Sequence, residues 1–149
     1  TAELELSTNS GDHRVRVAGP LASEQYHEHT RPLIPVPLRR LDDLLDEHGI
    51  AGSEVGLLWM DVQGHEQHVL EGAPKLLASG VPLVVELWPY GLRRAGVEPE
   101  ACAEYLGERF RSYYDLGQSA PATRPTAELR AILGELPSYK SFTDLLLVP

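Results

Sequence analysis

The sequence has few sulfur-containing side chains: its 149 residues include one cysteine, Cys102, and one methionine. A single cysteine cannot form a disulfide within the chain, and this usage is typical of proteins from a reducing compartment. We therefore expect a cytoplasmic location. Cys102 falls within a helical pattern, which favours a packed thiol over a nucleophile.

Long apolar runs and clustered positive charge are absent as well. No segment approaches the roughly 20 apolar residues that a membrane-spanning helix requires, and no charged-then-apolar leader opens the sequence. The 13 basic side chains are outnumbered by 22 acidic ones, giving a net charge of -9, and they are scattered along the chain. Because nucleic acids and anionic membranes are bound through clustered positive charge, we expect neither as a partner.

The remaining composition indicates one folded domain. The length of 149 residues is close to the commonest domain size. A content of 42% hydrophobic and 23% charged residues is ordinary for a globular protein. We therefore treat residues 1–149 as a single domain, in which the polar and aperiodic segment 19–31 predicts a surface loop.

The first third of the chain predicts a small antiparallel unit followed by a helix. Residues 2–7 and 13–17 alternate in polarity around a turn-forming segment, so they should form a hairpin. Residues 33–36 lie among prolines, which restricts them to an edge strand. Leucines at helical spacing then predict a helix over 38–48 that ends at Gly49.

The rest of the chain alternates between strand-like and helix-like segments. Two runs, 55–62 and 81–88, are apolar on both faces up to an acidic residue near their ends, as expected for parallel strands covered on both faces. Between them, Gly72 and Pro74 predict an interruption and two short helices. Helical and strand patterns then follow in turn, at residues 99–110, 112–116, 125–136 and 142–148. This order predicts an α/β fold of mostly parallel strands with right-handed crossovers and flanking helices.

Two acidic residues, Asp61 and Glu86, lie where the apolar runs end. Ligands of open α/β sheets bind beyond the carboxyl ends of the strands, and a carboxylate buried there needs hydrogen bonds or a charge partner. Asp61 could cap the following helix, or it could orient a substrate hydroxyl and take its proton. Glu86 could be a buried acid satisfied by the backbone, or part of the same site.

The neighbours of these acids are further candidates. Gly64 indicates a tight turn, either a plain one or one that brings the backbone close to a ligand. Trp88 and Tyr90 follow Glu86 and would either wall a pocket or serve as ordinary core residues.

Two histidines, His65 and His68, suggest a metal site together with Asp61. They are three residues apart, whereas the zinc-protease pattern requires histidines four apart. Metal-assisted hydrolysis is therefore a minor alternative, and we expect no metal site.

Around Asp61 the sequence resembles a known family. The motif LLWMDVQGHE at 57–66, followed by VLEGA at 69–73 and VVE at 84–86, is similar to the FkbM family of S-adenosylmethionine-dependent methyltransferases. Upstream, NSG at 9–11 and LDDLL at 41–45 are similar to elements that precede this motif in the family. The resemblance implies a Rossmann-like methyltransferase sheet, S-adenosylmethionine as the cofactor, and methyl transfer to an oxygen of a sugar or natural product.

The resemblance also implies roles for individual residues. Asp61 and Glu86 would be catalytic, and Asp61 would contact the cofactor together with Gln63 and Gly64. The acceptor side would be formed by His65, Trp88 and Tyr90.

The sequence departs from the family's pattern in ways that matter. Trp59 stands where family members usually carry lysine, and Gln63 stands where glutamate is commoner. The chain also has no counterpart of the family's first strand with its glycine-rich loop, or of the acidic residue that ends the second strand. Those parts hold the methionine carboxylate and the ribose of the cofactor. The resemblance therefore implies an incomplete domain, the C-terminal half of a methyltransferase.

The expected sheet supports the same interpretation. If 55–62 is a central strand, one of its edges needs a strand that this chain does not contain, and an apolar free edge promotes association. We expect a fragment of a longer protein, a homo-oligomer, or an edge covered by residues 2–7. Two functional hypotheses follow: a methyltransferase that acts on a small-molecule acceptor, or a non-catalytic, truncated module that serves in assembly.

Overall fold

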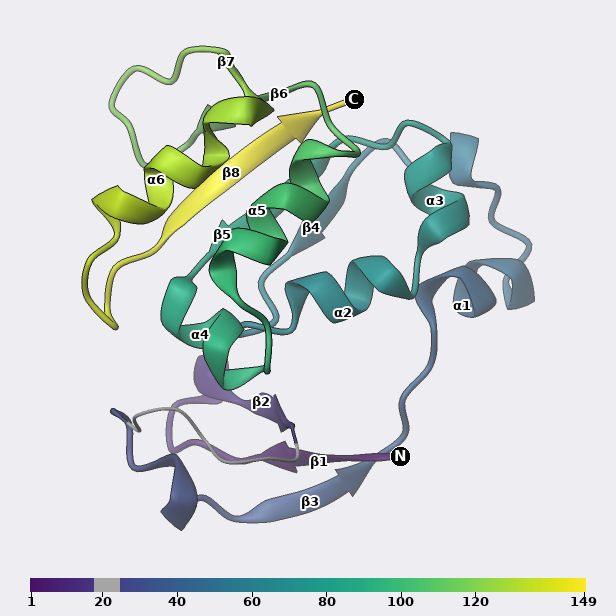
Figure 1. The fold of residues 1–149 in the computed structure, drawn as a ribbon. Coiled ribbons are helices and arrows are strands. Elements are labelled where there is room, and N and C mark those ends of the chain that lie inside the picture. The colour runs from purple at the N-terminus through teal and green to yellow at the C-terminus, as the bar shows by residue number, and fades with distance from the viewer. Residues whose placement is uncertain (18–24) are drawn as a thin grey trace.

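The computed structural model describes residues 1–17 and 25–149, and Figure 1 shows a larger sheet with helices beside a smaller sheet. The expected loop at 19–31 therefore lies partly outside the described residues. In chain order the elements are β1 (Ala2–Glu5), η1 (Ser10–Asp12), β2 (Arg14–Arg16), η2 (Glu28–Thr30), β3 (Leu33–Val36), α1 (Leu41–Glu47), η3 (Gly52–Glu54), β4 (Leu58–Met60), α2 (Glu66–Glu71), α3 (Pro74–Ala78), β5 (Leu83–Leu87), α4 (Pro89–Arg94), α5 (Pro99–Gly107), β6 (Ser112–Asp115), β7 (Arg124–Pro125), η4 (Thr126–Glu128), α6 (Leu129–Glu135) and β8 (Thr143–Val148).

The three N-terminal strands form a small antiparallel sheet in the order β2-β1-β3. Leu4 of β1 lies opposite Val15 of β2 and Ile34 of β3. The predicted hairpin and the edge position of β3 are therefore confirmed. Because β1 is the middle strand of this sheet, residues 2–7 do not cover an edge of the larger one.

The larger sheet has five strands in the order β4-β5-β8-β6-β7 and is mixed. Only the pairing of β4 with β5 is parallel, whereas β8 pairs antiparallel with both β5 and β6, and β7 pairs antiparallel with β6. The α/β class is confirmed, but the prediction of mostly parallel strands was wrong. Apolar runs indicate burial, and burial does not specify the direction in which a strand enters a sheet.

The strand expected over 55–62 is much shorter and lies at an edge. β4 comprises Leu58–Met60 and pairs with β5. The side chains of Leu57 and Trp59 are 44% and 73% exposed, so the prediction of a fully covered central strand was wrong. The hydrophobicity of this segment predicted that it would be buried. In the described part of the chain, however, β4 has one neighbouring strand instead of two.

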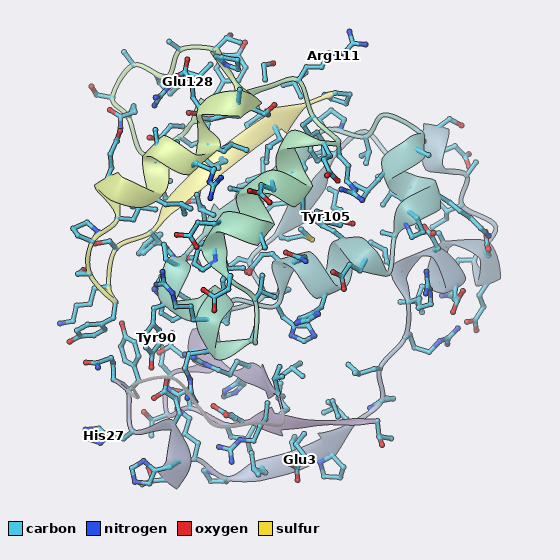
Figure 2. All side chains as sticks on the ribbon, viewed as in Figure 1. Glu3, His27, Tyr90, Tyr105, Arg111 and Glu128 are labelled. Atoms are coloured by element: carbon cyan, nitrogen blue, oxygen red, sulfur yellow. The ribbon has the colours of Figure 1, made fainter. Side chains whose placement is uncertain are left out.

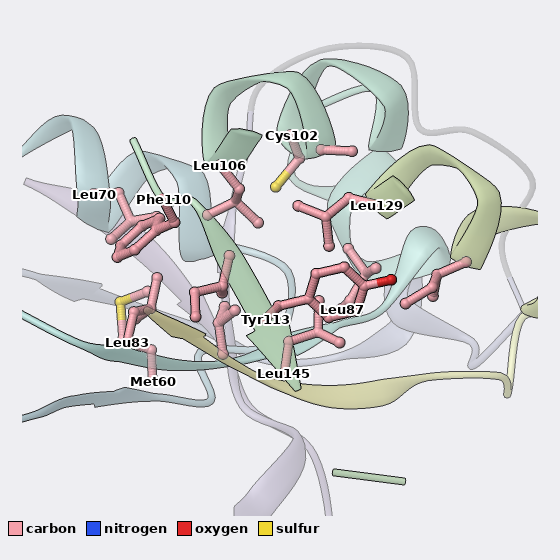
Figure 3. Packing of buried hydrophobic residues seen from close by; sticks show 14 of the residues in the cluster. Met60, Leu70, Leu83, Leu87, Cys102, Leu106, Phe110, Tyr113, Leu129 and Leu145 are labelled. Carbon is pink, nitrogen blue, oxygen red and sulfur yellow. The ribbon is translucent and has the colours of Figure 1, made fainter. Parts of the chain in front are cut away.

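The main core lies between one face of this sheet and the helices α2, α5 and α6. Figure 3 shows Leu106 of α5 and Leu129 of α6 packed over Tyr113 and Leu145. Cys102 of α5 is buried in the same cluster, and burial raises the pKa of its thiol to about 12. The expectation of a packed, unreactive thiol is consistent with this environment.

The opposite face of the sheet carries a second row of side chains in register. Trp59 of β4 lies beside Val84 of β5, which pairs with Leu146 of β8, and this in turn pairs with Tyr114 of β6. Because side chains alternate along a strand, Glu86 points to this same face, two residues beyond Val84.

Local sequence signals for the helices are largely confirmed. Gly72 and Pro74 separate α2 from α3, and Pro74 occupies the first turn of α3. Gly49 follows α1 with a φ of +66°, as a left-handed helix end requires. The helix expected from residue 125 instead opens with the 3-10 turn η4 and continues as α6.

Candidate functional site at the ends of β4 and β5

A tight turn follows β4 and is held by a carboxylate within the chain. Gln63 and Gly64 have φ values of +56° and +96°. Oε1 of Glu66 accepts hydrogen bonds from the backbone N–H groups of Val62 and Gly64, at 3.2 and 3.1 Å. Glu66 therefore accepts the backbone N–H groups of this turn, whereas the sequence suggested Asp61 as a possible cap of the following helix.

Glycine is required at position 64 because another backbone segment passes too close to leave room for a side chain. A Cβ atom at this position would lie 2.1 Å from the carbonyl oxygen of Gly91 in α4. This contact fixes the turn after β4 against the helix after β5, and it brings the two strand ends together. The glycine therefore serves the packing of α4, and no ligand is needed to explain it.

Three carboxylates gather at the strand ends. Asp61 is exposed, and its Oδ1 accepts a hydrogen bond of 2.9 Å from Nε2 of Gln63. Glu86 is half-buried and lies opposite Asp144 of β8 in the sheet register. The charge of Asp61 acts on both of the other two carboxyl groups.

Glu86 is the most perturbed of these acids. Its Oε2 is buried and has no hydrogen-bond partner among residues 1–17 and 25–149. Burial raises the pKa of Glu86 to about 8, and the charges of Asp61, Glu66 and Asp144 add to this effect. A carboxyl group with this pKa exchanges its proton near neutral pH, as a general base must.

Glu86 faces a pocket of about 240 Å³ that we name the strand-end pocket. Both sheets contribute to its walls, which are formed by Asp12, Arg14, Tyr26, Arg31, Gln63, Glu86, Trp88, Lys140 and Phe142. The small N-terminal sheet and its loop thus complete a site whose floor belongs to the larger sheet.

Aromatic side chains form one wall of the strand-end pocket. The rings of Tyr26 and Trp88 meet edge to face, with centroids 6.1 Å apart. Nε1 of Trp88 donates a hydrogen bond of 2.7 Å to the carbonyl oxygen of Tyr139, and the guanidinium of Arg14 lies 5.3 Å from the Trp88 ring centre. These contacts fix the indole, so its orientation is set before any ligand arrives.

A buried ionic cluster joins this wall to the small sheet. Glu28 accepts a hydrogen bond of 2.5 Å from the hydroxyl of Tyr90, and it pairs with Arg14 at 3.3 Å and Arg94 at 3.4 Å. Burial alone would raise the pKa of Glu28, but the hydrogen bonds from Tyr90 and from the Tyr26 N–H bring it below its ordinary value. Figure 2 shows Tyr90 where α4 meets the small sheet.

The structure brings together some of the predicted site residues and separates others. Gln63, Glu86 and Trp88 line the strand-end pocket, and Asp61 reaches it through its bond to Gln63. Tyr90 lines a neighbouring pocket, and its hydroxyl is engaged by Glu28.

His65 lies elsewhere, in a largely apolar groove with His68 and α1. Burial and the neighbouring His68 lower the pKa of His65 to about 4. The two imidazole rings are 4.3 Å apart, and Nε2 of His68 lies 2.9 Å from the Ala95 carbonyl oxygen. Over the described ranges, no three His, Cys, Asp or Glu side chains converge in a way that could hold a metal ion.

Several pocket residues escaped the sequence interpretation. Arg14 was part of a predicted strand, Arg31 and Tyr26 belonged to a polar loop, and Lys140 and Phe142 lie near the start of the last strand. The alternation of residues 13–17 puts Arg14 on the face opposite to Val15 and Val17, which by itself would predict an exposed arginine. No local signal connects Arg31 with Lys140.

Taken together, the mixed sheet and a pocket beyond its parallel strand ends define an α/β domain with a ligand site of the usual position. Residues 4–110 match the family model described as the methyltransferase FkbM domain. The chain therefore belongs to this family, which supports methyltransferase activity. The match includes the small sheet as well as both strand ends.

Comparison with curated proteins and with solved structures finds no match. Within 1–17 and 25–149 no helix is long and apolar enough to cross a membrane.

Proposed function

We propose that this domain transfers a methyl group from S-adenosylmethionine to an oxygen of a sugar or natural-product acceptor, with Glu86 as the proton acceptor. The observation that carries the proposal is the environment of Glu86. It faces the strand-end pocket, one of its oxygens lacks a partner in the described chain, and its pKa is about 8. A base of this pKa is partly ionised at neutral pH and still basic enough to take a proton.

The residues present fit the methyl-donor end of the cofactor. A sulfonium group is cationic, and it would be stabilised by the carboxylate of Asp61 and by Glu86 in its ionised form. Gln63 adds a side-chain amide between them. When bound, S-adenosylmethionine would supply an electrophilic methyl group.

The chain's own residues would position the acceptor and take its proton. Trp88 and Phe142 offer flat apolar surface against which a ring can lie. An acceptor hydroxyl placed beside Glu86 would donate its hydrogen bond to the ionised carboxylate where it lines the pocket, and would then lose its proton to that carboxylate. Asp61 holds Gln63 in place and raises the basicity of Glu86 by its charge. Such positioning and proton removal account for much of the rate in displacement reactions.

We propose further that the adenosine part of the cofactor is held by a segment outside this chain. The free edge of β4 and the exposure of Trp59, at 73%, support this, because an uncovered apolar edge is normally paired or covered. Size-exclusion chromatography combined with calorimetry tests the idea. A chain that is monomeric and binds S-adenosylhomocysteine tightly by itself would contradict it.

Methyl transfer from labelled S-adenosylmethionine to sugar acceptors tests the enzymatic function, in a protein that contains this chain. Glu86→Gln should reduce the rate by about 100-fold or more, as expected for loss of a general base, while the variant still unfolds cooperatively. Asp61→Asn should weaken the reaction through its effect on Glu86. Full activity of Glu86→Gln would refute the role of this residue. Failure of every longer form of the protein to bind S-adenosylhomocysteine would favour a non-catalytic assembly module.

A further inference from the structure

Two cations of the strand-end pocket have no acidic partner among residues 1–17 and 25–149. Arg31 and Lys140 both line the pocket, and neither forms an ion pair with any carboxylate that the structure describes. The chain carries 22 acidic and 13 basic side chains. Acidic partners are thus plentiful, and two unpaired cations at one pocket call for an explanation.

The two cations are presented from different parts of the fold. Arg31 follows η2, and its Nη1 donates a hydrogen bond of 3.0 Å to the carbonyl oxygen of Asp12, which orients the guanidinium. Lys140 lies in the loop before β8, with its Nζ 5.5 Å from the centre of the Tyr139 ring. Segments more than a hundred residues apart therefore direct positive charge at the same cavity.

The charge balance inside the pocket is opposite to that of the whole chain. Its basic residues are Arg14, Arg31 and Lys140, and its acidic residues are Asp12 and Glu86. Because the pKa of Glu86 is about 8, this group is mostly protonated and neutral at neutral pH. Arg14 is engaged by Glu28, so Arg31 and Lys140 provide the free positive charge.

We propose that Arg31 and Lys140 bind an anionic group, a phosphate or a carboxylate, that the methyl acceptor carries. This inference rests on the proposed function and narrows its substrate class to acidic or phosphorylated sugars. Arginine and lysine suit such groups because they make charge-assisted hydrogen bonds to their oxygens. The sugar ring would then lie against the face of Trp88, and the carboxyl group of Glu86 would receive a hydroxyl.

Binding of glucose 6-phosphate, glucose and inorganic phosphate to the chain tests the proposal without requiring methyl transfer. The chain has two tryptophans, so the background substitution Trp59→Phe leaves Trp88 of the pocket as the only indole to report binding by fluorescence. Arg31→Gln and Lys140→Gln are compared with Lys75→Gln. Lys75 pairs with Asp46 at 2.6 Å outside the strand-end pocket. Lys75→Gln therefore changes the net charge by the same amount as the two pocket variants without changing the pocket.

The expected result is that glucose 6-phosphate binds at least about tenfold more tightly than glucose, and more tightly than inorganic phosphate. Arg31→Gln and Lys140→Gln should each reduce the affinity for glucose 6-phosphate about five- to tenfold, the usual effect of one charged hydrogen bond at a partly exposed site. They should leave the affinity for glucose unchanged, and Lys75→Gln should not change the affinity for any probe. Added salt should reduce the affinity for the sugar phosphate but not that for glucose.

Three results would overturn the proposal. Equal affinity for glucose and glucose 6-phosphate would show that the pocket does not recognise an anionic group on the acceptor. Arg31→Gln and Lys140→Gln variants that bind all probes like Lys75→Gln would show that these two residues do not bind such a group. In a longer protein that binds S-adenosylhomocysteine, loss of that binding in the same variants, with the sugar phosphate unaffected, would assign the cations to the cofactor's carboxylate. If the sugar phosphate binds as expected while Glu86→Gln retains full methyl transfer, the assignment of the base fails and the anion site stands.

Discussion

At the scale of single residues, Glu86 and Gly64 show how the site is held. Glu86 has a buried oxygen with no hydrogen-bond partner in the described part of the chain, and it lies near two other acids, Asp61 and Asp144. Such an arrangement costs stability and is found where a reactive group is needed. Gly64 tolerates a backbone conformation and a contact that other residues would not.

The pH dependence of stability should report on Glu86. Folding raises its pKa from 4.5 to about 8, so the folded protein retains a proton that the unfolded chain releases, and the free energy of unfolding must fall as pH rises towards 8. His65, with its pKa lowered from 6.5 to about 4, acts in the opposite direction but only below pH 6.5. Urea unfolding between pH 6.5 and 8 should show this fall in the wild type and a smaller one in Glu86→Gln. Parallel curves would show that Glu86 is not perturbed.

Gly64→Ala should destabilise the protein by about 3 kcal/mol or more, since it combines a strained φ with overlap between its Cβ and the backbone of Gly91. Gly80→Ala is the matched control, because Gly80 has a φ of +79° and nothing within 4 Å of its Cβ position. That change should cost about 1 kcal/mol, the price of the left-handed conformation alone. Urea unfolding at one pH compares the two. Equal losses would mean that the approach of α4 does not matter.

At the scale of elements, the small sheet is attached to the larger part through α4. Short helices such as α4, with six residues, are not stable by themselves and depend on tertiary contacts. The cluster of Glu28, Arg94 and Tyr90 supplies those contacts from the buried side of the helix. Since the small sheet and its loop carry Asp12, Arg14, Tyr26 and Arg31 of the pocket, this attachment also shapes the site.

Tyr90→Phe tests the attachment. The change removes the hydroxyl that donates to Glu28 and accepts the N–H of Gln25, leaving a fully buried carboxylate with one donor fewer. The free energy of unfolding should fall by about 1–3 kcal/mol. Tyr114→Phe is the control, because the Tyr114 hydroxyl has no hydrogen bond to any described residue and should change stability little. Hydrogen exchange should show faster opening of β1 and β2 in Tyr90→Phe only. Unchanged exchange there would mean that Tyr90 does not anchor the small sheet.

At the scale of the whole molecule, the larger sheet is covered by helices on one face and ends in an open edge at β4 (Figure 1). The row that begins at the exposed Trp59 continues on the face opposite the helices through Val84, which is buried, and Leu146, which is half-buried. Apolar strands with free backbone groups tend to pair with other strands. The domain is therefore expected to associate, either with another segment of its protein or with a second copy.

Trp59→Lys should reduce this association. Sedimentation of the chain over a range of concentrations should show self-association in the wild type and a shift towards monomer in the variant, since lysine at an edge strand opposes pairing. Leu38→Lys adds the same charge at another apolar side chain, 54% exposed and outside the strands, and should leave association unchanged. Because Trp59 is 73% exposed, thermal stability should change little. A wild-type chain that is monomeric at every concentration would contradict the prediction.

Local periodicity and turn residues such as Gly49 and Pro74 were sufficient to predict the α/β class, most helix and strand positions, and the two acids at the strand ends. The edge position of β4 and the antiparallel direction of β8 became known from the folded structure, since burial carries no information on neighbours or direction. The folded structure also showed that Glu86 rather than Asp61 faces the pocket, and that Arg31 and Lys140 meet there. Those properties depend on contacts between segments that are distant in the sequence, and local sequence patterns do not predict such contacts.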